Sequence, residues 1–545
     1  MRRSRWLLWG VVGVLALPVL TVLASWGQWT AASQAILSEM AGTVLPDYAW
    51  TSLGLCFWVT LGVVTMGTVS AALVTLFDFR GRRTLEWALL LPLAMPAYVV
   101  AYAYTDFLQF SGPAQSALRE AFGWKGRVLP EVRSLWGAAC VFTVALYPYV
   151  YLLARSALAE RATHLMEAAR LLGAPLRRRI LQVALPLARP AIAAGTALAL
   201  METLADYGVS SYFGIQTFTA GIYKAWLVMD NRIAAAQLAT VLLVVVVLVL
   251  WVEQRAQSRL RFAAGRGARL SSEAQPIRLR GTAEVVALGL CAMPVLLGFV
   301  LPLAIMGHAL WQSDEGVQLP WDRFPGWALN SLKLGLVTAV LAVALAWLLA
   351  FQRRREPSWV TRWAVQLVGL GYAVPGAVIV VGLLLPVGWL QATWPQTQAG
   401  YWMTATVLGL VWAYLVRFVA VALQSVQSGY ARVPASLDDS ARMLGVSGWG
   451  LLRRVHAPLL KRSTAAALLL VLVDVMKELP ATLVLRPFNH DTLAVMAYQL
   501  ARDERLGEAA LPSLALVLVG LLPVMMLSRT MRSDSASKTP DVPRA

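Results

Sequence analysis

The chain has 545 residues, of which 58% are hydrophobic and only 14% are charged. Soluble globular proteins contain roughly 45–50% apolar and about 25% charged residues, so this composition excludes a soluble enzyme, a disordered chain and a disulfide scaffold. The net charge of +18 lies mainly in short loops between long apolar runs. We therefore interpret the charge as a signal of membrane topology and expect no nucleic-acid partner.

Twelve apolar runs are long enough to cross a bilayer as helices. The first six cover residues 6–25, 52–77, 87–104, 135–153, 190–212 and 234–251, and the second six cover residues 285–310, 331–351, 363–390, 401–426, 463–484 and 509–527. The first run has basic flanks but no clear small-residue cleavage site, so we expect an uncleaved helix rather than a signal peptide.

The loops between these runs alternate in charge. The N-terminus, the even-numbered loops and the C-terminal tail hold 34 lysines and arginines, whereas the odd-numbered loops hold 10. Basic loops stay on the cytoplasmic side of a membrane. The sequence therefore predicts a multi-pass protein in contact with membrane lipid, with its N- and C-termini in the cytoplasm.

Two of the basic loops carry the same motif. Residues 167–173 read Glu-Ala-Ala-Arg-Leu-Leu-Gly, and residues 439–445 read Asp-Ser-Ala-Arg-Met-Leu-Gly, an offset of 272. Similar offsets relate Pro186 to Pro458 (272), Ser52 to Ser331 (279) and Pro96 to Pro375 (279). Each half therefore carries six spans with the same orientation, which is a parallel repeat.

This repeat defines the expected organisation. We predict an all-α polytopic membrane protein of about 12 helices. The expected segments are a first repeat at 1–253, a cytoplasmic linker at 254–282, a second repeat at 283–528 and a cytoplasmic tail at 529–545.

The repeated motif predicts a short helix that ends at a glycine, since glycine permits the left-handed backbone at a helix end. Leu171, Leu172, Met443 and Leu444 give this helix an apolar face although it is too short to span a membrane. Such a helix can lie on lipid or enter a groove on a partner protein.

At these positions the sequence resembles a known family. The first copy has Glu167, Ala168, Ala169, Gly173, Val183, Leu185 and Pro186, and the second has Asp439, Ser440, Ala441, Gly445, Val455, Ala457 and Pro458. This pattern is similar to the signature of membrane permeases in bacterial ABC importers, with Asp, Ser and Ala replacing three signature residues in the second copy.

The resemblance implies the type I ABC importer permease fold in a bacterial cytoplasmic (inner) membrane. It implies that residues 167–173 and 439–445, including Leu172 and Leu444, couple to an ATP-binding cassette ATPase dimer at the cytoplasmic face. It also implies a substrate-binding protein at the outer face. The sequence holds no GxxxxGK[ST] loop, so we expect no cofactor and no catalytic residue in this chain, with ATP used by the partner subunit.

Two further stretches resemble the fused, double-length permeases of ferric-iron importers. They are residues 202–208 (Glu-Thr-Leu-Ala-Asp-Tyr-Gly) in the first half, and residues 475–483 with 485–488 in the second. The resemblance implies ferric iron as the cargo. Thiamine, sulfate or a polyamine carried by the same mechanism is an alternative, as is an ion-coupled secondary transporter. A membrane enzyme lacks support, because no cluster of catalytic side chains lies at the span ends.

Charged residues also lie deep inside two spans. Glu202 and Asp474 are about 16–18 Å from the starts of their spans at 1.5 Å per residue. Asp206, Lys477 and Glu478 follow them, and an isolated charge at this depth costs at least about 2.5–3.5 kcal/mol.

We hypothesise that Glu202, Asp206, Tyr207, Asp474 and Glu478 line a translocation path, with Lys477 pairing one of the acids. Their oxygen atoms suit a hard cation such as ferric iron. The alternative is that a buried Lys477–acid pair only holds the spans together. Arg417 either pairs with one of these acids or extends toward the membrane surface.

The remaining candidates are weaker. His164, His308, His456 and His490 show no ligand spacing, and the three cysteines lie in apolar runs, so neither a firm metal site nor a disulfide is predicted. The outward loops carry a mixed-charge set suited either to protein docking or simply to solvation: Arg486, Asp491, Arg502, Asp503, Glu504, Arg505 and Glu508.

Overall fold

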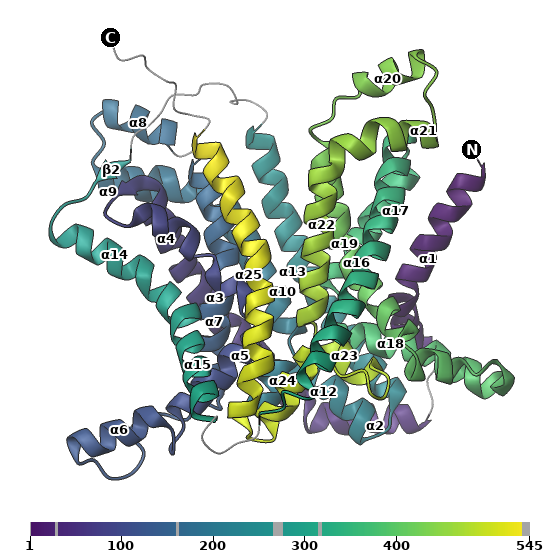
Figure 1. Cartoon of the computed structure of the whole chain (residues 1–545), viewed down its shortest axis with the longest axis horizontal. Helices are drawn as coiled ribbons and strands as arrows, with labels where there is room; N and C mark the ends of the chain where they lie inside the picture. The colour runs from purple at the N-terminus through teal and green to yellow at the C-terminus, as the bar shows by residue number, and fades with distance from the viewer. Residues whose placement is uncertain (1, 28–30, 160–162, 265–275, 314–318, 537–545) are drawn as a thin grey trace. The chain divides into compact units, whose positions relative to one another are not determined.

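The computed structural model describes residues 2–27, 31–159, 163–264, 276–313 and 319–536. Within these ranges the chain is almost entirely helical, apart from one pair of two-residue strands (Figure 1). Long runs of Leu, Val and Ala favour helices in a membrane because a helix satisfies every backbone polar group within its own segment. The predicted all-α polytopic fold is confirmed.

The described residues contain ten helices that are long and apolar enough to cross a membrane, or 11 if one bent pair counts as a single span. The expected span at 87–104 is that bent pair, which turns by 90°. The expected span at 463–484 is not among these ten helices, and its helix α22 (Ala457–Lys477) ends before the expected span does. The remaining ten expected spans correspond to the ten helices.

The chain divides into two compact units that exchange segments of the sequence. Unit 1 contains Met1–Thr43, Gly221–Leu243 and Pro320–Gln499, and unit 2 contains Val44–Ala220, Val244–Leu319 and Leu500–Ala545. The first helix in the chain thus belongs to the unit formed mainly by the second half. The last helix belongs to the unit formed mainly by the first half.

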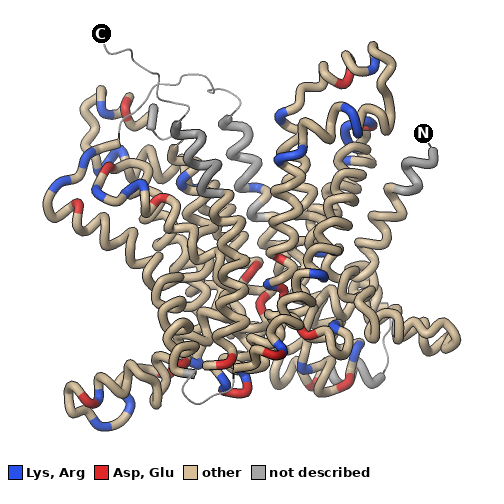
Figure 2. The backbone as a smooth tube through the Cα atoms, in the orientation of Figure 1, with Lys and Arg blue, Asp and Glu red and all other residues tan. Residues whose placement is uncertain are grey.

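Unit 1 is built around three long helices, α16 (Phe324–Arg355), α19 (Leu408–Tyr430) and α22, which pack on one another (Figure 1). Its other elements are α1 (Arg2–Ala24), η1 (Ser25–Gly27), α2 (Ala31–Gly42), the start of α13 (Arg232–Ala264), α17 (Trp359–Gly369), η7 (Gly371–Ala373), α18 (Gly376–Thr393), η8 (Pro395–Thr397), η9 (Tyr401–Ala405), α20 (Ser436–Met443), α21 (Trp449–Leu451), η10 (Leu452–His456), α23 (Pro480–Leu485) and most of α24 (Leu493–Arg502). Lys and Arg gather at the end of this unit where α20 and α21 lie (Figure 2).

Unit 2 is built around α3 (Leu45–Leu76), α7 (Leu135–Ala157) and α10 (Leu185–Ala205). Its other elements are β1 (Phe77–Asp78), α4 (Arg82–Ala88), η2 (Leu91–Ala94), α5 (Ala97–Leu108), α6 (Pro113–Phe122), α8 (Thr163–Leu171), α9 (Leu176–Arg179), η4 (Ile180–Ala184), α11 (Gly208–Phe213), most of α13, β2 (Ile277–Arg278), α14 (Thr282–Val295), η6 (Leu296–Val300), α15 (Leu301–Ser313) and α25 (Leu506–Ala536). The short helix α12 (Phe218–Tyr223) crosses from unit 2 to unit 1 along the sequence, and η5 (Lys224–Val228) follows it in unit 1.

Glycines let the central helices of each unit approach closely. In unit 2, a Cβ on Gly67 of α3 or on Gly195 of α10 would lie 2.7 Å or 2.6 Å from atoms of Val150 in α7. In unit 1, a Cβ on Gly429 of α19 would lie 2.5 Å from the Ser463 hydroxyl of α22. Small residues at such contacts are typical of helix packing in membranes, where van der Waals contact holds helices together.

The expected linker is partly structured. Helix α13 continues to Ala264, and β2 pairs in parallel with β1, so that Phe77 faces Ile277. Residues 265–275 of the expected linker and 537–545 of the expected tail lie outside the described residues. The end of the linker is therefore fixed to the end of α3 inside unit 2.

Candidate functional site

Both repeats interrupt a long helix at the same position. Helix α10 ends at Ala205 and α11 begins at Gly208, whereas α22 ends at Lys477 and α23 begins at Pro480. Asp206 and Glu478, which are related by the repeat offset, adopt extended backbone with ψ of 133° and 124°. The deep acids predicted from the sequence thus lie at helix breaks, where unwound backbone groups need polar partners.

Glu478 caps the second half of the broken helix in unit 1. Its carboxylate accepts hydrogen bonds from the backbone N–H groups of Ala481 and Thr482, both at 3.0 Å, and from the Thr482 hydroxyl at 2.7 Å. The Thr482 hydroxyl also lies 2.6 Å from the hydroxyl of Tyr414. A carboxylate is stabilised at a helix N-terminus by these N–H groups and by the helix dipole.

Arg417 is the cation that faces this cap. Its Nη1 atom lies 3.8 Å from Oε1 of Glu478, and the two side chains are only 10% and 2% exposed. The structure therefore selects ion pairing over extension toward the membrane surface for this residue. A buried pair of this kind is costly to break, because removing one partner leaves the other charge uncompensated.

Asp206 caps the equivalent helix in unit 2 through a hydrogen bond to a backbone N–H group. One carboxylate oxygen accepts a hydrogen bond of 2.8 Å from the backbone N–H of Val209, in the first turn of α11. The carbonyl of Leu204, near the end of α10, accepts a hydrogen bond of 2.6 Å from the Thr219 hydroxyl. Asp206 and the adjacent Tyr207 are half-buried.

The other predicted path residues lie on the helices that lead to these breaks. Glu202 lies in the last turn of α10, and Asp474 and Lys477 lie in the last turn of α22. All three side chains are half-buried. Their role in lining a translocation path stays a prediction, because Glu202 belongs to unit 2 whereas Asp474 and Lys477 belong to unit 1.

A second break in each unit packs against the first. Pro96 precedes α5 with φ −60° and ψ 141°, and Pro375 precedes α18 with φ −58° and ψ 141°. Proline lacks the N–H that a continuous helix needs, so both breaks follow from the sequence. In unit 1, α18 packs on α23, and a Cβ on Gly376 would lie 3.0 Å from Oε1 of Glu478. In unit 2, α5 packs correspondingly on α11.

The two repeated loop motifs form short helices with the same ending. In α8, the N–H of Gly173 bonds the carbonyl of Arg170, and that of Ala174 bonds Ala169, both at 3.0 Å. In α20, Gly445 bonds Arg442 at 3.0 Å and Val446 bonds Ala441 at 2.9 Å. Gly173 and Gly445 have φ of +77° and +79°, so each helix ends in a Schellman motif that requires glycine.

These helices present apolar side chains to their surroundings. The most exposed are Leu171 (89%), Leu172 (87%), Met443 (88%) and Leu444 (83%). Glu167, Ala168, Asp439 and Ser440 are exposed as well, whereas Ala169 is half-buried and Ala441 is buried. An exposed apolar face on a short, rigidly ended helix is suited to insertion into a groove on another protein.

A buried polar cluster beneath α20 was missed by the sequence analysis. Asp438, directly before Asp439, contacts Arg354 and His456, and His456 is fully buried. The sequence shows no ligand spacing around His456. The signal that points to the cluster is the repeat itself, because the first copy has Met166 and Ala184 where the second has Asp438 and His456.

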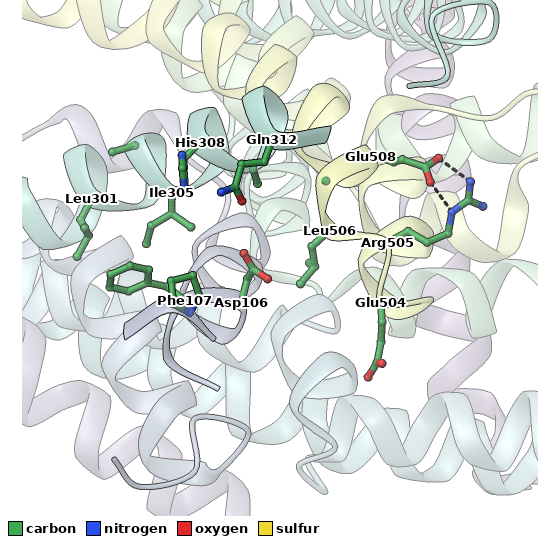
Figure 3. Close-up of a pocket in the computed structure, with 14 residues that line it drawn as sticks. Asp106, Phe107, Leu301, Ile305, His308, Gln312, Glu504, Arg505, Leu506 and Glu508 are labelled. Atoms are coloured by element: carbon green, nitrogen blue, oxygen red, sulfur yellow. Dashed lines mark hydrogen bonds and ion pairs between the residues drawn. The ribbon is translucent and has the colours of Figure 1, made fainter. Parts of the chain in front are cut away.

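Unit 2 contains a cavity of about 600 Å³ where α5, α15 and the start of α25 meet (Figure 3). Its polar lining residues include Asp106, His308, Gln312 and Glu504. Arg505 and Glu508, also at this cavity, bond each other with distances of 2.7 and 2.5 Å. Part of the mixed-charge set from the expected outward loops therefore gathers around one hollow.

Other members of that set are paired locally. Arg486 forms an ion pair with Asp491, and Glu504 lies 3.7 Å from Arg133. Across the described part of the chain, no group of three or more His, Cys, Asp or Glu side chains is arranged to hold a metal ion. The local chemistry of the helix breaks thus includes capped helix ends and the buried Arg417–Glu478 ion pair.

Comparison with known proteins connects these features. The family model described as binding-protein-dependent transport system inner membrane component matches twice, at residues 63–262 and 342–532. The Fe(3+)-transport system permease protein FbpB 2 of Haemophilus influenzae is 25% identical over 480 residues, which cover 86% of this chain and 87% of that relative.

Two more relatives differ from each other in how much of this chain they match. The putative 2-aminoethylphosphonate transport system permease protein PhnV of Salmonella typhimurium is 28% identical over 267 residues, or 46% of this chain and 94% of its own. The probable ABC transporter permease protein y4fN of Sinorhizobium fredii is 22% identical over 573 aligned residues, or 98% of this chain and 96% of its own. Because the family model matches both repeats and most of the chain, this protein belongs to the binding-protein-dependent transport system inner membrane components, as a double-length permease of the ABC importer family.

Proposed function

We propose that this chain is the translocating subunit of an ATP-driven importer and that it moves ferric iron. The observation that carries the proposal is the pair of identically terminated helices, α8 and α20, each presenting exposed leucine or methionine side chains. Two such helices on one chain suit the two halves of an ATPase dimer. Ferric iron is supported by the similarity to the Fe(3+)-transport permease across 86% of the chain.

The proposed orientation follows the basic residues. With both termini in the cytoplasm of a bacterium, α8 and α20 face the ATPase, and the cavity beside His308 and Glu504 faces outward, toward a substrate-binding protein. Accessibility labelling of single cysteines at the exposed positions Glu167 and Asp439 tests this arrangement in intact cells. Both positions should be protected from an impermeant reagent, and labelling of only one of them would contradict the parallel repeat.

Docking to the ATPase is tested by changing the exposed apolar residues. Leu172→Asp and Leu444→Asp should leave the folded protein intact, because both side chains are more than 80% exposed. Each should weaken co-purification with the ATPase and abolish cargo movement. Leu227→Asp serves as the matched control, because Leu227 is also exposed (58%) but lies in η5 of unit 1, outside both repeated motifs.

The cargo is tested in proteoliposomes that contain the permease, the ATPase and the binding protein. ATP-dependent uptake of ferric iron should exceed that of thiamine, sulfate, a polyamine and 2-aminoethylphosphonate. Uptake of one of these in place of iron would keep the mechanism and change the cargo. Uptake driven by a proton or sodium gradient, with the permease alone, would instead identify an ion-coupled secondary transporter.

A further inference from the structure

The second coupling helix, α20, is tied to the membrane helices by a buried polar network. The Asp438 carboxylate accepts hydrogen bonds from Arg354 Nε at 2.7 Å and Arg354 Nη2 at 3.0 Å. The same carboxylate lies 3.0 Å from His456 Nε2. Arg354 is in the last turn of α16, and His456 lies where η10 leads into α22. Asp438 therefore joins α20 to two membrane helices at once.

The network also includes the end of α19. The Tyr430 hydroxyl lies 3.1 Å from His456 Nδ1. Arg354 donates to the carbonyls of Val433 and Pro434, both at 3.0 Å, in the chain between α19 and α20. A neutral His456 with its proton on Nε2 satisfies both neighbours, since it donates to Asp438 and accepts from Tyr430. These directed bonds fix α20 relative to α16, α19 and α22, all within unit 1.

The first coupling helix, α8, has no counterpart of this network among its repeat-related residues. At the offset of 272, Leu158, Met166 and Ala184 replace Tyr430, Asp438 and His456. All three are buried, at 1%, 5% and 1% exposure. The residue related to Arg354 by the offset of 279 is Thr75. Three of the four corresponding positions in unit 2 therefore carry apolar side chains, whose contacts are non-directional, and the fourth carries a short hydroxyl side chain.

We propose that Arg354, Tyr430, Asp438 and His456 are positioning residues that make the two coupling helices mechanically unequal. This inference rests on the proposed ATPase coupling. When the ATPase moves α20, the helices α16, α19 and α22 move with it as one rigid body. Helix α8, in contrast, can shift relative to the apolar residues on which it packs. The attachment of α20 therefore determines how much cargo is moved per ATP hydrolysed.

The test uses the first repeat as a template. The fourfold variant Arg354→Thr/Tyr430→Leu/Asp438→Met/His456→Ala gives the second copy the residues of the first. Replacing a whole buried ionic network by apolar residues is often neutral for stability, whereas removing one member strands a buried charge. The fourfold variant should therefore fold with a thermal midpoint near that of the wild type, and Asp438→Asn serves as the single-residue comparison.

Hydrogen exchange of the permease alone, without the ATPase, measures how firmly the network holds α20. In the wild-type permease, the amides of residues 439–446 should exchange about tenfold more slowly than those of 167–174, because charged hydrogen bonds hold α20 in place. The fourfold variant should lose this difference. Equal exchange of the two helices in the wild type would overturn the proposal, whatever the outcome of transport measurements.

Cargo moved per ATP hydrolysed measures the function. In reconstituted transporter, the fourfold variant should bind the ATPase and hydrolyse ATP, but its cargo-to-ATP ratio should fall by about fivefold, within the range for residues that couple distant sites. The control Trp347→Phe removes a 3.1 Å hydrogen bond from α16 to Thr464 of α22. It keeps an aromatic ring beside Tyr430, whose ring centroid lies 6.2 Å from that of Trp347, so it should leave the ratio unchanged.

The outcomes separate the two proposals. A fourfold variant that folds and keeps the wild-type ratio would show that the network is only structural, and would overturn the inference. Failure of the wild-type protein to move cargo with ATP would refute the proposed function instead. A variant that misfolds is replaced by Tyr430→Leu/His456→Ala, which keeps the Arg354–Asp438 pair and should lower the ratio by a smaller factor; an unchanged ratio in that variant would also overturn the inference.

Discussion

At the break between α22 and α23, the Glu478 carboxylate combines three hydrogen bonds with the ion pair to Arg417. We expect Glu478→Gln to lower the free energy of unfolding by about 3–5 kcal/mol, because it removes the carboxylate charge that faces the buried Arg417 guanidinium. Thermal unfolding of the detergent-solubilised protein measures this change. Asp206→Asn, at the equivalent break, should cost less than about 1 kcal/mol, since asparagine caps helices as well as aspartate does. Equal effects of the two substitutions would contradict this assignment.

The ionisation of Asp438 should also affect stability. Burial acts to raise the pKa of this carboxyl, but hydrogen bonds from Arg354 and His456 and the charge of Arg354 lower it by more, so the pKa in the folded protein lies below its usual value. A carboxyl with a lowered folded pKa stabilises the protein above its unfolded pKa of about 3.9, and this contribution is lost as the pH falls through the folded value. The difference in thermal midpoint between wild type and Asp438→Asn should therefore be large at about pH 7 and pH 5, and should shrink near pH 3. A difference that grows on acidification would be inconsistent with this sign.

At the scale of the element, a glycine with left-handed backbone ends both α8 and α20. Gly445→Ala should destabilise the end of α20 by about 1–2 kcal/mol, because a Cβ disfavours positive φ, and φ here is +79°. Gly445→Asn is the matched control, since asparagine tolerates this conformation better. Exchange of the Val446 amide, whose bond to Ala441 closes the helix, should accelerate more in the alanine variant than in the asparagine variant.

Local sequence patterns account for much of these elements. The prolines at 96 and 375 mark the breaks before α5 and α18, and Gly173 and Gly445 mark the helix ends, because each acts through its own backbone. The repeat offset placed Asp206 and Glu478 at corresponding positions, where the structure has corresponding breaks. The sequence did not predict that these acids cap the helices that follow, since the charged residues were read as part of continuous spans.

Local sequence patterns do not predict contacts between residues that are distant in the sequence. The Arg417–Glu478 pair joins residues that are 61 positions apart in the sequence, and the Arg354–Asp438 pair joins residues that are 84 positions apart. Apolar periodicity carries no information about which helix lies beside which. The same limit explains the exchange of α1 and α25 between the compact units, because packing partners, not sequence order, decide where a span belongs.

At the scale of the whole molecule, α1 illustrates how that exchange is held together. Pro18 cannot bond the carbonyl of Val14, and this carbonyl instead accepts a 3.0 Å hydrogen bond from the indole of Trp412 in α19. Helix α1 also packs closely on α18, where a Cβ on Gly382 would lie 1.9 Å from the carbonyl oxygen of Pro18. In unit 2, α25 packs on α15 and α5. Helix α1, from the first half of the sequence, thus packs on helices of the second half, and α25, from the second half, packs on α5 of the first.

This exchange predicts how the protein behaves when its chain is cut. Two half-chains separated within residues 265–275 should co-purify when expressed together, because α1 and α25 each hold a surface on the other half. Gly382→Leu should weaken this association and lower the thermal midpoint, since the added side chain would occupy the space of α1. Gly369→Leu, where a Cβ meets nothing within 4 Å, should do neither. Half-chains that purify separately, or a Gly382→Leu complex as stable as the unsubstituted one, would mean that the exchanged helices do not hold the halves together.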